Sequence, residues 1–129
     1  MNFSILSDPS NLKVVRNQLR SFIKDKNLNK IDENSTILAT DEAIQNVIRY
    51  AYDLDKDKKI DINFDIKNES LVIKIRDYGK QVPIDQIRPR ELNDVKPGGL
   101  GVHFIQRICK KVKYSHVVDG GGTELTLIF

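Results

Sequence analysis

Several features that mark other classes of protein are missing from this chain of 129 residues. It has one cysteine, Cys109, which excludes an intramolecular disulfide and is typical of a reducing compartment. No apolar run approaches the ~20 residues that a membrane-spanning helix requires. The segment Met1–Ser10 lacks the basic and apolar regions of a signal peptide. We therefore expect a cytoplasmic protein without a membrane partner.

Glycine is absent from the first 78 residues, and all seven glycines follow that point. They lie at Gly79, in the group Gly98–Gly101 and in the run Gly120–Gly122. Glycine allows tight turns and close approach of the backbone to another group. The second half of the chain is therefore predicted to carry a site built from loops.

An excess of charge of one sign is also missing, since 21 Lys and Arg residues are balanced by 18 Asp and Glu residues. This balance is typical of a mixed, solvated surface. A basic run that could bind nucleic acid is absent as well, because Asp57 interrupts the segment Lys56–Lys59. We expect no direct contact with nucleic acid. A DNA affinity that depends steeply on salt would instead indicate a nucleic-acid-binding protein.

The spacing of apolar residues predicts three helices and about five strands in a single domain, 1–129. The expected strands are 3–6, 60–66, 71–77, 114–118 and 123–129. The expected helices run from Pro9 to Ile23, from Asn34 or Ser35 to Tyr52, and after Gly101 through Ile108 and Val112. Because the strands do not alternate strictly with the helices, the fold class is α+β. We expect a two-layer α/β sandwich with a mixed, mostly antiparallel sheet.

Two polar residues, Glu42 and Asn46, lie four positions apart on the second expected helix. At 100° per residue they share one face, and Arg49 falls in the same arc. Most amphipathic helices have such a solvated face, so the pair alone is weak evidence for a site. A carboxylate beside an amide oxygen is also what a general base next to a Mg²⁺ ligand would provide.

Two glycine-containing segments follow. Asp77 and Gly79 lie where a strand passes into a loop, which fits either an ordinary turn or an acceptor carboxylate with exposed backbone around it. The segment Pro97–Gly101 precedes a helix, where backbone amides form an anion site. It matches neither the P-loop nor the dinucleotide fingerprint, so a flexible linker stays open as the alternative.

The order of these motifs resembles the Bergerat (GHKL) ATP-binding fold of gyrase and the histidine kinases. The order is Glu42-Ala-Ile-Gln-Asn46 on a helix, Asp77-x-Gly79 after a hairpin, Gly98-Gly-Leu-Gly101 before a helix, and Gly122-Thr123 at the last strand. The pattern Glu-Ala-x-x-Asn-x-x-x-x-Ala-Tyr, which ends at Tyr52, is similar to one branch in particular. That branch is the bacterial anti-sigma-factor serine/threonine kinases of partner-switching systems.

The resemblance implies ATP and Mg²⁺ as cofactors and a role for each matching residue. Glu42 would be the catalytic general base, and Asn46 would hold Mg²⁺. Asp77 would accept a hydrogen bond from the adenine amino group, and Gly79 would let the base lie close. Thr123 would lie near the adenine.

The resemblance also implies that the motif Gly98-Gly-Leu-Gly101 binds the phosphates. Gly99, Leu100 and Gly101 would bring backbone amides to them. Positioning, a metal and a base are what phosphoryl transfer needs.

The resemblance further implies a kinase that phosphorylates a serine of a small STAS-domain anti-anti-sigma protein. The same protein would sequester an alternative sigma factor, and homodimers are common in the family. One departure is Gln81, which stands where the family has a second glycine. The alternative is therefore a non-catalytic nucleotide-binding or protein-interaction module of the same fold. A histidine-kinase catalytic domain is disfavoured, because no helix pair bearing a phosphorylated His is evident.

Overall fold

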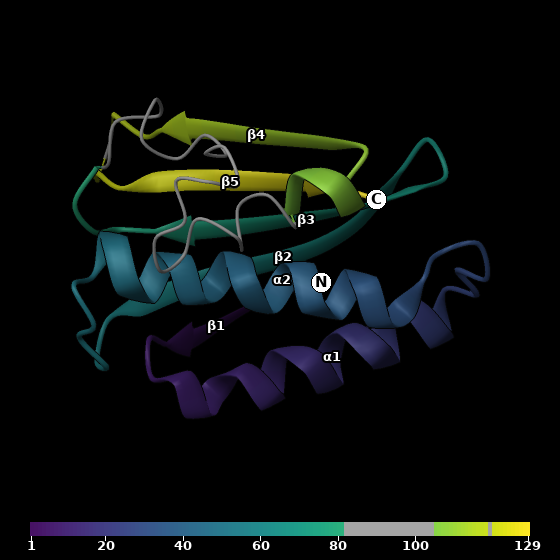
Figure 1. Ribbon diagram of the computed structural model, residues 1–129, viewed down its shortest axis with the longest axis horizontal. Helices are drawn as coiled ribbons and strands as arrows, with labels where there is room; N and C mark the ends of the chain where they lie inside the picture. Colours follow the sequence, from purple (N-terminus) through teal and green to yellow (C-terminus); the bar gives the residue numbers. More distant parts are fainter. Residues whose placement is uncertain (82–104, 119) are drawn as a thin grey trace, which may run out of the picture.

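The computed structural model describes residues 1–81, 105–118 and 120–129, and Figure 1 shows two layers within these ranges. One layer is a sheet. The other contains helices α1 (Leu12–Asp25) and α2 (Glu33–Asn46), which lie side by side across one face of the sheet (Figure 1). A short helical turn at residues 105–108 lies over the same face.

The sheet has five strands in the order β1-β2-β3-β5-β4, and every neighbouring pair is antiparallel. Their bounds are β1 Asn2–Leu6, β2 Lys59–Lys67, β3 Ser70–Asp77, β4 Lys111–His116 and β5 Thr123–Ile128. The α+β sandwich expected from the sequence is confirmed. The sheet is antiparallel throughout the described strands, where a mixed sheet was expected.

The core lies between the sheet and the helices. Alternate residues of each central strand point into it, as the period of two predicts. Ile62, Phe64 and Ile73 of the sheet are at most 1% exposed, and Leu19 and Ile44 of the helices are completely buried. The opposite face of the sheet carries the polar members of the same alternation. Only one face of the sheet therefore has a covering layer among the described residues.

The helix boundaries follow from local side chains. The 3₁₀ turn η1 (Pro9–Asn11) precedes α1, and the Asp8 carboxylate accepts a hydrogen bond from Ser10 N at 2.9 Å. The N-cap of helix α2 is Asp32, which lies two or three residues before Asn34 or Ser35, the caps expected from the sequence. After Asn46 the helix widens into the π-helical segment η2 (Val47–Ala51).

The C-terminal expectation was wrong in one respect. Val112 belongs to strand β4, which begins at Lys111, and not to the preceding helix. The spacing of Ile105, Ile108 and Val112 fits a helix, but Val112 and Tyr114 also alternate and pair with Leu127 and Leu125 of β5. Pairing with a central strand decides the ambiguity. Strand β4 therefore begins three residues before the expected 114.

Two further features are the length of the helices and the place of the single cysteine. Within the described ranges, no helix combines the length and the apolar character that crossing a bilayer would need. Cys109 follows the 105–108 turn and is 8% exposed. Burial raises the pKa of its thiol to about 12, so the thiol behaves as an apolar core group.

Candidate functional site

Asp77 ends the core-facing row of strand β3, and it is the one carboxylate in that row. Its side chain is 3% exposed. Burial raises the pKa of Asp77, and hydrogen bonds from the backbone N–H groups of Gly79 and Thr123 act in the opposite direction. The Gly79 bond to Oδ1 measures 3.0 Å. A buried acceptor whose backbone partners fix its orientation suits recognition of a donor group on a ligand.

Gly79 passes so close to the end of η2 that no larger residue fits there. A Cβ at this position would lie 2.3 Å from the carbonyl oxygen of Ala51 and 2.8 Å from the Tyr52 ring. The next residue continues the contact, because Lys80 N donates to Ala51 O at 3.0 Å. The end of strand β3 is therefore joined to the end of the helix that carries Asn46. The structure explains Gly79 by this approach, and its predicted contact with a base stays a prediction.

Gly122 holds the other side of Asp77. Its φ of 79° is one that side chains rarely adopt, and a Cβ would lie 2.0 Å from Asp77 O. The next residue, Thr123, is 9% exposed and donates its backbone N–H to the Asp77 carboxylate. The fold thus brings the second and fourth sequence motifs together, and their predicted contact with adenine stays a prediction.

Asn46 is the last residue of α2, where the helix widens into η2. Its Oδ1 is buried and makes no hydrogen bond, and no other buried side-chain polar atom of the described residues is in that condition. Such an atom costs about 1–3 kcal/mol of stability. An unsatisfied buried group in a native protein calls for an explanation, and a catalytic role or a bound ion is among the known ones. An amide oxygen is a ligand type that Mg²⁺ accepts.

Glu42 lies one helical turn before Asn46 and is partly exposed. The preceding residue, Asp41, pairs with Arg16 of α1, with Nε 3.0 Å from Oδ2. Burial raises the pKa of Asp41, while the charge of Arg16 and its hydrogen bond act to lower it. This pair fastens α2 to α1 beside Glu42. A partly exposed carboxylate on a fixed helix can reach a substrate that arrives from solvent.

Within the described residues, no group of three or more His, Cys, Asp or Glu side chains could hold a metal by itself. Mg²⁺ is commonly bound by few protein ligands together with the phosphates of a nucleotide. Asn46 fits that mode, since it offers one oxygen and leaves the other positions of the ion open. Gly99, Leu100 and Gly101, which were predicted to contact phosphate, lie outside the described residues.

Sequence reasoning did not foresee the contacts that Gln81 and Tyr52 make around the ends of strand β3 and of the β4–β5 connection. Gln81 Nε2 donates to Gly122 O at 3.0 Å and to Val117 O at 3.2 Å, which ties the chain after β3 to the β4–β5 connection. The Tyr52 hydroxyl accepts a hydrogen bond from Tyr78 N at 2.7 Å. Its place in the Ala-Tyr ending of the helix motif was the available signal.

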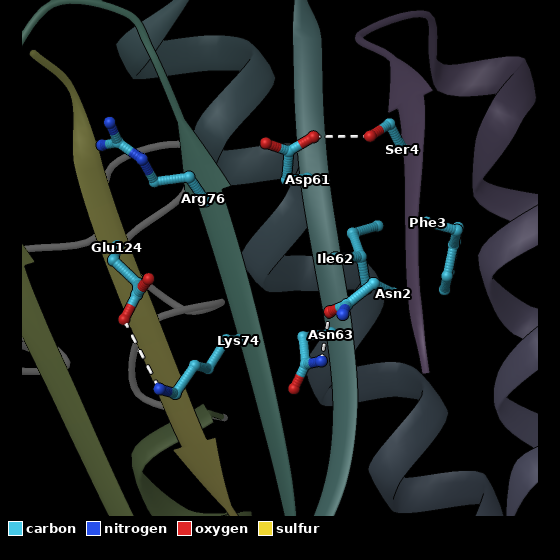
Figure 2. Close-up of a pocket in the computed structure, with 9 residues that line it drawn as sticks. All are labelled: Asn2, Phe3, Ser4, Asp61, Ile62, Asn63, Lys74, Arg76 and Glu124. Carbon is cyan, nitrogen blue, oxygen red and sulfur yellow. Dashed lines mark hydrogen bonds and ion pairs between the residues drawn. The ribbon is translucent and has the colours of Figure 1, made fainter. Parts of the chain in front are cut away.

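A hollow lies on the open face of the sheet, on the side away from the helices (Figure 2). Its volume is about 580 Å³, and its lining includes Lys74, Arg76 and Glu124. Lys74 pairs with Glu124 at 3.8 Å. None of the residues predicted from the sequence motifs lines this hollow. The candidate site is therefore the Asp77 and Asn46 region on the helix side of the sheet.

Comparison with known proteins gives a family match over nearly the whole chain. Residues 5–129 match the family of histidine kinase-like ATPase domains. No curated protein matches the sequence significantly.

Solved structures with a similar fold exist. The RsbU and RsbW domains of Rv1364c from Mycobacterium tuberculosis match 99% of this chain with a TM-score of 0.64 and 18% identity. The histidine kinase AdeS from Acinetobacter baumannii matches 98% with a TM-score of 0.54 and 20% identity. This chain spans 32% of the mycobacterial chain and 66% of the AdeS chain. At these identities the matches show a shared fold.

Proposed function

This chain belongs to the family of histidine kinase-like ATPase domains, and from that membership we propose that it is an ATP-dependent protein-serine kinase and anti-sigma factor. Its substrate would be a serine of a STAS-domain anti-anti-sigma protein. Its other partner would be an alternative sigma factor, which it would sequester. A structure that includes an RsbW domain shares the fold of this chain, which is compatible with this branch of the family.

One observation carries the proposal, which is the orphaned Oδ1 of Asn46. The atom is buried without a partner, one helical turn after a carboxylate that remains partly exposed. A solvated helix face, the simplest explanation of Glu42 and Asn46, would leave the amide in water. The arrangement instead pairs an unfilled oxygen with a nearby base, which is what a metal-assisted transfer to a hydroxyl requires.

Each residue then has a definite task. Asp77 accepts a hydrogen bond from the adenine amino group while Gly79 and Thr123 hold its carboxylate in place. Asn46 Oδ1 would take one position on Mg²⁺, and the bound ion would neutralise phosphate charge. Glu42 accepts the proton of the substrate serine as the serine oxygen attacks the terminal phosphorus of ATP, and the bond from that phosphorus to the bridging oxygen breaks so that ADP leaves. This chain supplies position and a base, and Mg²⁺ would supply the charge neutralisation that phosphoryl transfer also needs.

Phosphate transfer to a STAS-domain protein with Mg²⁺ and ATP tests the proposal. Mass spectrometry should find one phosphate on a serine of the acceptor. Glu42→Gln keeps the size of the side chain and removes the base, so the transfer rate should fall about 10²- to 10⁴-fold. Asn46→Ala should abolish transfer, and Asn34→Ala, on an exposed part of the same helix, should not. Equal transfer by Glu42→Gln and wild type would refute the assigned base.

The regulatory half of the proposal is tested by binding. The chain should co-elute with its sigma factor in the presence of ATP. The STAS protein, when unphosphorylated, should displace that sigma factor. Sedimentation of the chain alone measures whether it forms the homodimer that this branch favours. If the chain transfers phosphate but binds no sigma factor, it is a kinase and the proposed anti-sigma function is wrong.

A non-catalytic module is the second candidate, and Gln81 is the observation that favours it. Its amide bonds to Gly122 O and Val117 O beside Asp77, where the resembling family has a glycine. Calorimetry with ATP and ADP separates the two candidates. No heat and no thermal shift with either nucleotide favour a protein-interaction module, whereas heat of binding without phosphate transfer favours a non-catalytic nucleotide-binding module.

A further inference from the structure

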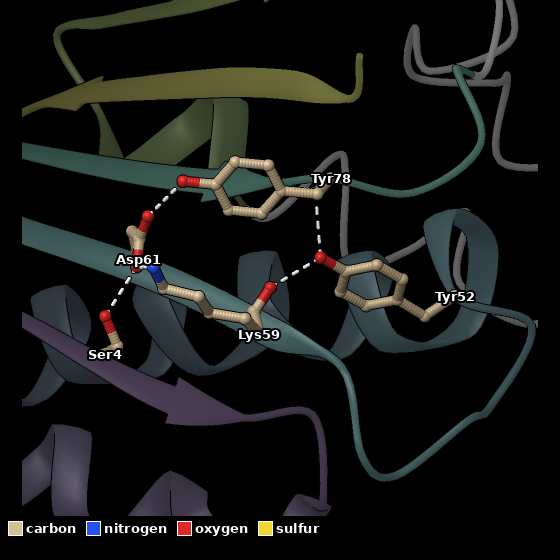
Figure 3. A network of polar contacts seen from close by, with 5 residues as sticks. All are labelled: Ser4, Tyr52, Lys59, Asp61 and Tyr78. Atoms are coloured by element: carbon tan, nitrogen blue, oxygen red, sulfur yellow. Dashed lines mark hydrogen bonds and ion pairs between the residues drawn. The ribbon is translucent and has the colours of Figure 1, made fainter. Parts of the chain in front are cut away.

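We propose that Tyr52 is a positioning residue, whose hydroxyl sets the place of Asp77 and thereby the preference of the site for adenine. This inference rests on the proposed function, because it assigns a base-reading role to Asp77. Figure 3 shows the contacts that carry it, with the Tyr52 hydroxyl between the backbones of strands β2 and β3. The Tyr52 side chain comes from the end of η2 and is 6% exposed.

The hydroxyl lies where the ladder between β2 and β3 stops. Asp77 is the last β3 residue of that ladder and pairs with Ile60. The next pair would be Lys59 with Tyr78. The Tyr52 hydroxyl instead accepts a hydrogen bond from Tyr78 N at 2.7 Å and donates one to Lys59 O at 2.5 Å. One side-chain oxygen thus replaces the direct bond between two strands.

The inserted hydroxyl has a geometric consequence. Two backbone groups that share an oxygen lie farther apart than two that bond directly, so β3 diverges from β2 immediately after Asp77. This divergence directs the chain toward Ala51, where Gly79 and Lys80 make their contacts. Gly79 N in turn binds the Asp77 carboxylate at 3.0 Å. The orientation of that carboxylate therefore depends on the Tyr52 hydroxyl.

If this hydroxyl is removed, the chain after Asp77 can rearrange in two ways, and both alter the site. Tyr78 N and Lys59 O can close on each other and extend the ladder by one pair, which draws Gly79 away from Ala51. Otherwise both groups stay apart and lose their partner, which buried backbone groups rarely tolerate. In either case Asp77 loses its fixed position while the core beneath it, built from other residues, is kept.

The neighbouring Tyr78 supplies a matched control. Its own hydroxyl donates to Asp61 on the open face, and its ring lies 4.4 Å from the Arg76 guanidinium (Figure 3 shows the Asp61 contact). Tyr78→Phe also removes one tyrosine hydroxyl, and it does so in the residue whose backbone is bonded to Tyr52. It leaves the Tyr78 N–H and its bond to Tyr52 unchanged.

The test measures ATP and GTP affinity of wild type, Tyr52→Phe and Tyr78→Phe by calorimetry. Adenine presents an amino group to Asp77, where guanine presents a carbonyl oxygen. We expect Tyr52→Phe to weaken ATP binding roughly tenfold, as loss of one well-placed hydrogen bond does, and to leave GTP binding nearly the same. The ratio of the two affinities should fall accordingly. Tyr78→Phe should keep the wild-type ratio.

A purely structural role for Tyr52 gives a different result, since partial unfolding lowers the binding-competent fraction and leaves the ratio unchanged. Hydrogen exchange adds a measurement that needs no variant. In the nucleotide-free wild type, the Tyr78 amide should be protected like the amides of the β2–β3 ladder. An unprotected Tyr78 amide, or a Tyr52→Phe variant with the wild-type ratio, overturns the inference. A wild type that binds no nucleotide overturns the proposed function instead.

Discussion

Replacing Asn46 by leucine should stabilise the nucleotide-free protein while it removes the function. Leucine has nearly the shape of asparagine, and it places an apolar group where Oδ1 is buried without a partner. An unsatisfied buried acceptor costs about 1–3 kcal/mol. Asn46 as a whole residue remains partly exposed, so we expect a gain of about 1–2 kcal/mol. For a domain of this size the gain corresponds to a rise in Tm of about 3–10 °C.

Thermal and urea unfolding without nucleotide measure this gain. Asn34→Leu is the control, since Asn34 is exposed on the same helix and its replacement should change stability by less than about 0.5 kcal/mol. Saturating Mg²⁺ and ATP should then stabilise the wild type and leave Asn46→Leu unchanged. If Asn46→Leu is less stable than the wild type in the absence of nucleotide, Oδ1 has a partner in solution and the argument for a metal ligand fails.

Three further predictions follow from the surroundings of Asp77 and from the core. Gly122→Ala should lower the unfolding free energy by about 2 kcal/mol or more in urea titrations, because a Cβ would lie 2.0 Å from Asp77 O at a φ of 79°. Burial raises the pKa of Asp77 above its value in the unfolded chain, so the folded state binds the carboxyl proton more tightly. The stability that this proton contributes to the wild type is therefore lost as pH rises through the folded pKa. The stability of Asp77→Asn relative to wild type should therefore improve from pH 3 to pH 7, and a flat difference would contradict the buried carboxylate. Burial also raises the pKa of the Cys109 thiol to about 12, so iodoacetamide at neutral pH should label the protein only in denaturant, as read by mass spectrometry.

Local chemistry made most of the fold predictable. The alternation of Ile60, Ile62 and Phe64 identified a half-buried strand before any contact was known, and the structure confirms it. The boundary between the 105–108 helical turn and strand β4 was not predictable from the sequence. The apolar residues on both sides of it fit the helical repeat of 3.6 residues as well as the strand repeat of two. Only pairing with β5 separated the two, and pairing is a contact between segments that are distant in sequence.

The candidate site divides in the same way. Types and spacings of residues singled out Glu42, Asn46 and Asp77, since a carboxylate and an amide one turn apart need only the helical repeat to share a face. The sequence could not show that Asn46 Oδ1 is buried without a partner, because that depends on everything packed around it.

Tertiary structure alone decided how Asp77 is held. Gly79 meets Ala51, and Gly122 meets Asp77, through backbone contacts between segments far apart in the chain. The Tyr52 hydroxyl occupies a gap that exists only because two strands diverge there. By itself the sequence determined the two-layer architecture and the chemistry available to it, because periodicity and residue type are local properties. The positions of those groups depend on close packing, which only the folded chain defines.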